Sequence, residues 1–151
     1  MLIQFQEYLT IQNIYLYTNF GILPFWFMLI FAPNSKITQI FINSIVLPLI
    51  LSSAYIYILY KSILLGEDLL NLFKIYLSLD DLYTLFSTES FLLIFWLHFL
   101  ALNIFLGSWV SRDALRYSVP KFLSGISLIS IYFTGPLGLV FYWFIRIIKI
   151  K

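Results

Sequence analysis

The sequence predicts an all-α membrane protein: a four-transmembrane-helix bundle with an amphipathic interfacial helix between spans 2 and 3. Three observations predict this class. Of the 151 residues, 62% are hydrophobic and only 11% are charged, whereas soluble domains have about 45–50% apolar and about 25% charged residues. Four long stretches contain no charged residue, and a fifth places its polar residues on one helical stripe. In water, so small a chain would expose large apolar patches.

The composition also excludes several classes of protein. A net charge of +2 is too small to indicate a nucleic-acid partner. The absence of cysteine excludes disulfides, thiolate metal sites and a cysteine nucleophile. The sequence contains no P-loop, no dinucleotide glycine motif, no HExxH and no pair of carboxylates inside an apolar stretch. We therefore expect the lipid bilayer as partner, no nucleic acid, no metal site and no required cofactor.

The four uncharged stretches define the predicted spans. A spanning helix needs about 20 mainly apolar residues, and the stretches that meet this length are 13–31, 37–60, 90–110 and 122–145. The first two are separated only by residues 32–36, where Pro33 and Asn34 favour a reversal. We expect the first two spans to form an antiparallel hairpin, and the whole chain, 1–151, to form a single membrane domain.

The stretch between the second and third spans has a different pattern. Glu67, Asn71, Lys74, Ser78 and Asp81 recur at spacings of four, three, four and three. This periodicity predicts an amphipathic helix over 66–86 that lies in the membrane interface. Its polar stripe is mostly acidic, whereas lipid-binding helices are usually basic. The pattern therefore favours contact with the bundle or with a protein partner over contact with anionic headgroups.

Four spans would place both termini and the loop over 61–89 on one side of the membrane. That side would carry five Lys and Arg residues and the other side four. Such a difference is hardly a bias under the positive-inside rule. We expect both termini on the cytoplasmic or stromal side.

His98 is the only ionisable residue deep inside a predicted span. Intramembrane ionisable groups are costly and usually face a bundle interior or a cavity. One interpretation is a hydrogen bond that holds two helices together. The others are an acid–base role, because the imidazole pKa lies near neutrality, or ligation of a chlorophyll magnesium through a neutral ring nitrogen. The helical face of His98 continues through Leu102, Phe105 and Trp109 to Arg112 or Asp113, with Asn103 nearly opposite.

Polar residues also mark the end of the third span and the middle of the fourth. Asp113 lies where it would pair with Arg116 or Lys121, so the cluster is either a topological anchor or the polar rim of a binding pocket.

In the fourth span, Ser127, Ser130, Thr134 and Gly138 form a stripe typical of close helix packing, with substrate contact as the alternative. The Gly135–Pro136 step predicts a kink in that helix and hence a cavity wall. The tryptophans fit interfacial aromatic belts, and Trp96 lies one residue from the His98 face.

Three motifs, in order, carry a family resemblance. They are Leu23-Pro24-Phe25-Trp26 followed by Ala32-Pro33-Asn34, then Trp96-Leu97-His98-Phe99-Leu100-Ala101-Leu102-Asn103-Ile104-Phe105-Leu106-Gly107-Ser108-Trp109 continuing into Arg112-Asp113-Ala114, and Gly135-Pro136-Leu137-Gly138-Leu139-Val140-Phe141-Tyr142. The chain thereby resembles the neoxanthin-synthesis-related (abscisic-acid-deficient 4-like) family of small membrane proteins. The middle motif is the specific one. Asn103 departs from the pattern, since the resemblance leads us to expect aspartate there.

The resemblance implies a multi-pass protein of a plastid, thylakoid, cyanobacterial or other bacterial membrane. It also implies a carotenoid ligand, and a possible isomerase activity that opens an epoxide to an allene, as in the conversion of violaxanthin into neoxanthin. Under this hypothesis His98 is a proton shuttle, and Asp113 with Arg112 holds the oxygenated end ring. Asn103 orients the ligand, and the remaining candidate binding residues are Trp26, Trp96, Trp109 and Thr134. His98 and Asp113 are separated by about 22 Å at helical rise, so only one can be the chemical centre.

Two other functions stay open at this point. The first is a non-catalytic subunit or assembly factor of a photosynthetic membrane complex, with chlorophyll bound through His98 and a partner protein at the 66–86 helix. The second is a small transporter, which has least support because one ionisable group offers few sites for an ion or proton relay.

Overall fold

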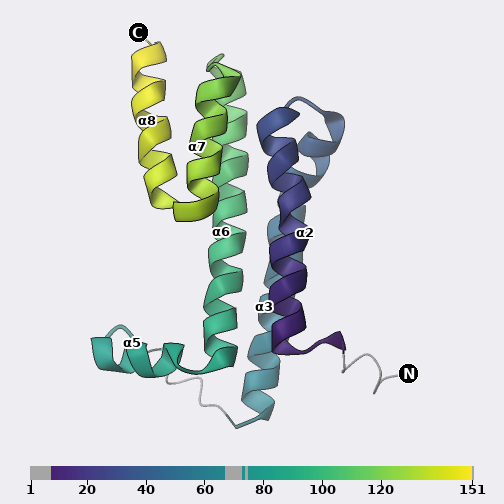
Figure 1. Cartoon of the computed structure of the whole chain (residues 1–151), viewed down its shortest axis with the longest axis vertical. Helices are drawn as coiled ribbons and strands as arrows, with labels where there is room; N and C mark the ends of the chain where they lie inside the picture. The colour runs from purple at the N-terminus through teal and green to yellow at the C-terminus, as the bar shows by residue number, and fades with distance from the viewer. Residues whose placement is uncertain (1–7, 67–72, 74, 151) are drawn as a thin grey trace. The chain divides into compact units, whose positions relative to one another are not determined.

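The computed structural model describes residues 8–66, 73 and 75–150, and within these residues the fold is entirely helical (Figure 1). This confirms the all-α prediction. Three helices are long and apolar enough to cross a membrane: α2 (Ile11–Phe31), α3 (Val46–Leu64) and α6 (Glu89–Arg116). They correspond to the first three predicted spans.

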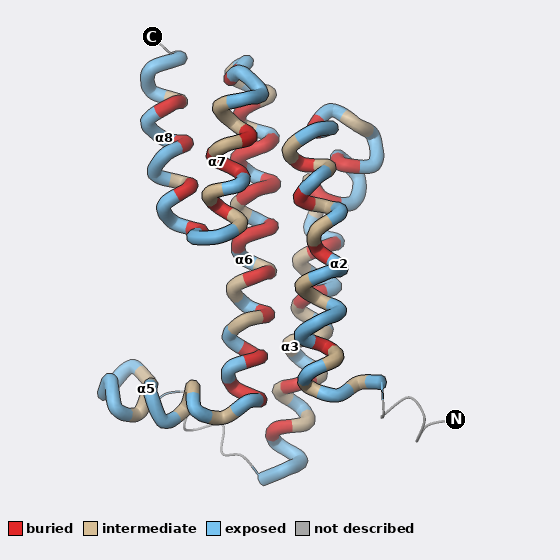
Figure 2. The backbone as a smooth tube through the Cα atoms, viewed as in Figure 1, coloured by how far each residue is buried: buried red, intermediate tan, exposed pale blue. Residues whose placement is uncertain are grey.

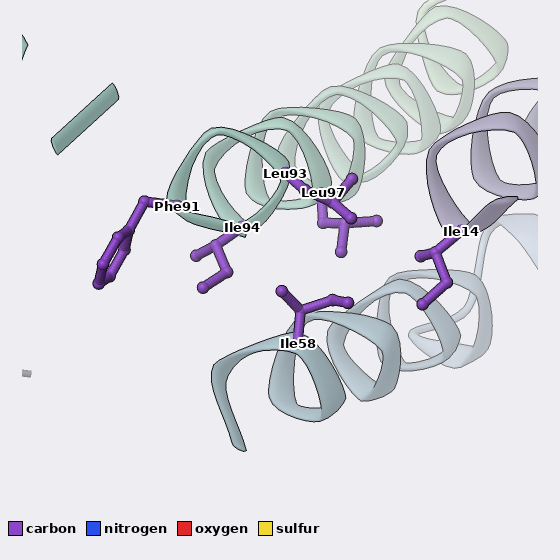
Figure 3. Packing of buried hydrophobic residues seen from close by; sticks show 6 residues of the cluster. All are labelled: Ile14, Ile58, Phe91, Leu93, Ile94 and Leu97. Atoms are coloured by element: carbon purple, nitrogen blue, oxygen red, sulfur yellow. The ribbon is translucent and has the colours of Figure 1, made fainter. Parts of the chain in front are cut away.

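The chain forms two compact units. Unit 1 consists of Met1–Asn19 and Leu51–Phe99, and unit 2 consists of Phe20–Ile50 and Leu100–Lys151. The single domain over 1–151 therefore stays a prediction. In unit 1 the core joins Ile14 of α2, Ile58 of α3 and a row of α6 residues that includes Ile94 and Leu97 (Figure 3). Ile58 is 1% exposed and Leu97 is fully buried, so α2, α3 and α6 share one apolar core there.

The turn after α2 is longer than the sequence predicts. Residues Thr38–Ile42 form a π-helix, η1, and α3 begins only at Val46. The fully buried Thr38 donates its hydroxyl to the carbonyl of Ala32 at 2.8 Å, and its backbone N–H donates to Ser35 Oγ at 3.1 Å. These bonds satisfy polar groups that lipid would leave unpaired, which delays the start of the second span.

Helix α6 extends further than predicted, over 28 residues from Glu89 to Arg116. At 1.5 Å per residue it is about 42 Å long, which exceeds a hydrocarbon core of about 30 Å. Buried and exposed residues alternate along α6 (Figure 2). His98, Leu102, Phe105, Trp109 and Arg112 are all exposed, and Asn103 is buried. Asp113, the alternative end of the predicted face, is only 11% exposed.

The prediction of one spanning helix over 122–145 is wrong. The chain forms α7 (Lys121–Thr134) and α8 (Pro136–Ile150), which pack against each other (Figure 1). Gly135 between them has φ 58°, a conformation that glycine adopts readily, and Pro136 begins α8, where its missing N–H costs nothing. At 14 and 15 residues each helix is about 22 Å long, short of a span. The expected kink is thus a full reversal.

The helix predicted over 66–86 also differs. Residues 67–72 and 74 lie outside the described part of the chain. The described part contains a turn at 75–77 and then the eight-residue α5 (Leu79–Phe86). Ser78, predicted as part of the polar stripe, instead caps α5, since its Oγ accepts from the backbone N–H of Asp81 at 3.1 Å. This N-cap fixes the start of the helix, and an interfacial location stays a prediction.

Candidate ligand-binding site

A polar cluster in unit 2 joins the end of α6 to α8. Tyr142 donates its hydroxyl to Asp113 Oδ2 at 2.8 Å, and Arg146 Nε lies 2.9 Å from the same oxygen. The Nε–H group of Arg146 makes no aligned hydrogen bond, so its contact with Asp113 is an ion pair. Tyr142 and Arg146 are one helical turn apart, which is why both reach one carboxylate. The Asp113 side chain is only 11% exposed.

Aromatic rings surround this cluster. The Arg146 guanidinium lies over the Tyr117 ring, 4.6 Å from its centroid. Hydrogen bonding to Tyr117 raises the pKa of Arg146 above its ordinary value, and the charge of Asp113 raises it further against the opposing effect of desolvation. Trp109 packs edge-on against Tyr142 at 6.1 Å between centroids. Arg146 is therefore charged at any physiological pH and is held in place by aromatic neighbours.

A groove of about 430 Å³ lies beside the cluster in unit 2. Its walls come from α6 and α8 and consist of Trp109, Leu139, Val140, Tyr142, Trp143, Phe144 and Arg146. The volume is within the range typical of small-molecule sites, which are mostly apolar with a few placed polar groups. The groove suits an apolar ligand that carries an oxygen at one end.

The structure brings together only some of the predicted site residues. Trp109 lines this groove. Asp113 is not one of the lining residues, but it contacts two of them, Tyr142 and Arg146. Arg112 is exposed and is not among the groove-lining residues. The predicted partner of Asp113 is also wrong, since the ion pair is with Arg146 rather than with Arg116 or Lys121. A single fourth span would have put Arg146 on the other side of the membrane, and the reversal at Gly135 returns it to Asp113.

Three other predicted residues lie elsewhere in unit 2. Trp26 is buried against Gly107 and packs edge-on with Tyr132 at 5.4 Å. Asn103 is 6% exposed and lies against the turn at Gly135. Its Nδ2 has no hydrogen-bond partner among the described residues. Thr134 donates its hydroxyl to the carbonyl of Ser130 at 2.7 Å, within α7. In the structure these contacts serve packing around the hairpin, and a ligand role for the three residues stays a prediction.

His98 and Trp96 belong to unit 1. The exposed His98 lines an apolar cavity of about 380 Å³, whose walls include Phe86, Phe91 and Phe95. Trp96 donates Nε1–H to Asn19 Oδ1 at 3.1 Å and borders a separate groove of about 440 Å³. Since His98 and Asp113 are fifteen residues apart on one continuous helix, about 22 Å at helical rise, the structure gives them two separate surroundings.

Tyr142 and Arg146 were missed by the sequence analysis, which placed them at the far end of a fourth span. Their spacing of four residues was the available signal, because it puts a phenol and a guanidinium on one face of a helix. Among the described residues, no group of three His, Asp or Glu side chains is arranged to hold a metal ion. The groove therefore offers a phenol and a guanidinium, and both contact the carboxylate of Asp113. Together these groups can accept a proton, donate one and bind an oxygen.

Comparisons with known proteins agree with the resemblance. The profile of the family described as ABA DEFICIENT 4-like matches residues 13–142, a range that includes Asp113 and Tyr142. The chain is 31% identical over 102 residues to the Arabidopsis thaliana protein named ABA DEFICIENT 4, chloroplastic, covering 66% of this chain and 46% of that protein. The chain thus matches about half the length of this relative. No solved structure matches. With a profile match over most of its length, including the α6 motif, this chain belongs to the ABA DEFICIENT 4-like family.

Proposed function

We propose that this protein binds an epoxy-carotenoid in a plastid or bacterial membrane and isomerises it at the groove of α6 and α8 beside Asp113. The observation that carries this proposal is the cluster itself. The Asp113 carboxylate is held by Tyr142 and Arg146, two residues that line an aromatic groove. Asp113 and Tyr142 lie within the residues that the family profile matches. A carotenoid end ring has the matching chemistry, since it is apolar and bears oxygen.

The proposed reaction needs one acid and one base. Asp113 takes the proton from the polyene carbon next to the ring, and the released electron pair forms the second double bond of the allene. The adjacent C–O bond of the epoxide breaks, and Tyr142 donates a proton to the oxygen, which becomes a hydroxyl. The new proton on Asp113 then returns to Tyr142 along their 2.8 Å hydrogen bond. Atoms and electrons balance without a redox partner.

Each group at the site has a defined part in this scheme. Both contacts of Asp113 fall on Oδ2, so Oδ1 is not engaged by Tyr142 or Arg146 and can face the ligand. Arg146 stabilises negative charge that develops on the epoxide oxygen, an interaction that gains strength away from water. Trp109 and Trp143 supply the apolar walls. Asn103, which lies under the hairpin turn, has no step in the reaction.

The deciding experiment uses a strain that lacks the gene and the purified protein. We expect the deletion strain to accumulate an epoxy-carotenoid and to lose the allenic product, and we expect purified protein in liposomes to convert violaxanthin, as measured by chromatography. An unchanged carotenoid profile in the deletion strain would rule out the enzymatic proposal. Tight binding without conversion would reduce the proposal to carotenoid binding.

A second candidate function rests on His98. His98 is exposed and lines an apolar, aromatic cavity. A neutral imidazole in that setting suits the magnesium of a chlorophyll, as in a non-catalytic subunit of a photosynthetic complex. Chlorophyll absorbance that co-purifies with the protein and is lost in His98→Ala would favour this function. Carotenoid conversion that survives His98→Ala would assign the chemistry to Asp113.

A further inference from the structure

The reversal at Gly135 changes how the charges of the chain are distributed across a membrane. Within the part of the chain that the structure describes, only α2, α3 and α6 are long and apolar enough to span. Helix α8 returns along α7 to the end of α6, where Arg146 meets Asp113. Three crossings leave the segment before α2 and the α3–α6 connection on one side. They leave the α2–α3 turn, the α6–α7 turn and the end of α8 on the other.

The basic residues follow this division closely. The second side carries seven of the nine Lys and Arg residues: Lys36, Arg112, Arg116, Lys121, Arg146, Lys149 and Lys151. The first side carries only Lys61 and Lys74. The acidic residues are distributed in the opposite way, since Asp113 is the one of seven on the basic side. Under four spans the basic residues would divide five to four, so the hairpin converts a balanced distribution into a strong bias.

We propose that the protein crosses the membrane three times, with the seven-residue basic rim against the anionic lipids of the cytoplasmic or stromal leaflet. The positive-inside rule counts Lys and Arg close to the ends of the spans. Lys36, Arg116 and Lys121 lie within a few residues of a span end, and the ion pair with Asp113 brings Arg146 back to the end of α6. Basic residues near an anionic surface are attracted to it. The segment before α2 therefore lies on the outer or lumenal side. This reverses the expected location of the N-terminal segment and separates it from the end of α8.

One consequence for the site rests on the proposed function. Asp113 and Arg146 lie at the basic ends of α6 and α8, so the oxygenated ring would enter from the cytoplasmic or stromal leaflet. The topology itself does not depend on carotenoid chemistry and is tested separately.

Single cysteines test the number of crossings directly, because the chain contains none. Four exposed positions are suitable: Thr10→Cys, Asn34→Cys, Leu77→Cys and Lys149→Cys. We expect a membrane-impermeant maleimide to label Thr10→Cys and Leu77→Cys in intact bacterial spheroplasts that express the full chain. Asn34→Cys and Lys149→Cys should react only after the membrane is opened. Labelling of Thr10→Cys and Lys149→Cys from the same side would overturn the three-crossing topology, and the fully inverted pattern would overturn the orientation.

Charge removal tests whether the basic rim sets the orientation. A triple variant lowers the number of basic residues on the rim from seven to four: Lys36→Gln, Arg116→Gln and Lys121→Gln. We expect labelling of Thr10→Cys in intact spheroplasts to fall to about half, as molecules insert in both orientations. The control is Asp80→Asn with Asp81→Asn, which removes two exterior carboxylates and should leave labelling unchanged, because acidic residues contribute little to orientation. Unchanged labelling in the triple variant would overturn the role of the rim.

Discussion

Replacing Asp113 with asparagine is expected to lower conversion of the epoxy-carotenoid by about 10²- to 10⁴-fold, the usual contribution of a general acid or base. Asparagine keeps the shape of the side chain, and its oxygen still accepts from Tyr142. It cannot take up the proton, and it leaves Arg146 without its ion-pair partner. Carotenoid binding should fall much less than conversion, because the apolar walls of the groove are unchanged. Single-turnover reactions analysed by chromatography distinguish a loss of conversion from a loss of binding.

Two further variants make this result specific. Tyr142→Phe removes the proton donor and keeps the ring that packs against Trp109, so it should also lose conversion while retaining bound carotenoid. Asp80→Asn makes the same chemical change at an exposed position on α5 and should behave like the unmodified protein. If Asp113→Asn converted substrate at an unchanged rate, the chemical centre would lie elsewhere, and His98 would be the next residue to test.

Replacing Gly138 with alanine is expected to destabilise the hairpin of α7 and α8 by about 3 kcal/mol, the upper part of the range for overpacking a tight contact. An added Cβ would collide with the backbone N and Cα of Ile131, and helix backbone yields less easily than the end of a flexible side chain. We expect a lower thermal midpoint, measured in detergent on the whole chain. Contact between Asp113 and Arg146 should weaken at the same time, because α8 moves away from α7.

Three other glycines provide controls with graded expected effects on stability. Gly21→Ala meets no atom within 4 Å and should be neutral, or stabilising by up to about 1 kcal/mol from helix propensity. Gly125→Ala makes ordinary contact with Ile30 at 3.6 Å and should have a small effect. In Gly107→Ala the added Cβ would lie 2.7 Å from the Trp26 ring. Its loss of stability should be larger than that of Gly21→Ala and Gly125→Ala and smaller than that of Gly138→Ala. A thermal midpoint for Gly138→Ala equal to that of Gly21→Ala would mean that α7 and α8 do not pack this closely.

The first three spans could be predicted because the signal is local. A run of about 20 uncharged residues favours lipid wherever it occurs, so residues 13–31 and 90–110 agree with α2 and α6 to within a few positions, apart from the C-terminal end of α6. The start of the second span was less predictable. Thr38 delays it through hydrogen bonds to Ala32 and Ser35, and hydropathy does not report such bonds.

The fold of the fourth apolar stretch could not be predicted from local sequence patterns. Hydropathy measures whether residues 122–145 can enter lipid, but it does not distinguish a kinked span from a hairpin. The Gly135–Pro136 step permits both conformations. The choice depends on contacts between residues distant in sequence, such as Gly138 against Ile131 and Asp113 with Arg146.

By itself, the sequence determined the helical class, the membrane environment and the family, since these follow from composition and from motifs read in order. Only the tertiary structure decided the reversal at Gly135, and with it the partner of Asp113. The proposed site and the proposed orientation both depend on that reversal. The physical reason is that an ion pair and a close backbone contact form only when the chain turns back on itself, and no periodicity along the chain records that turn.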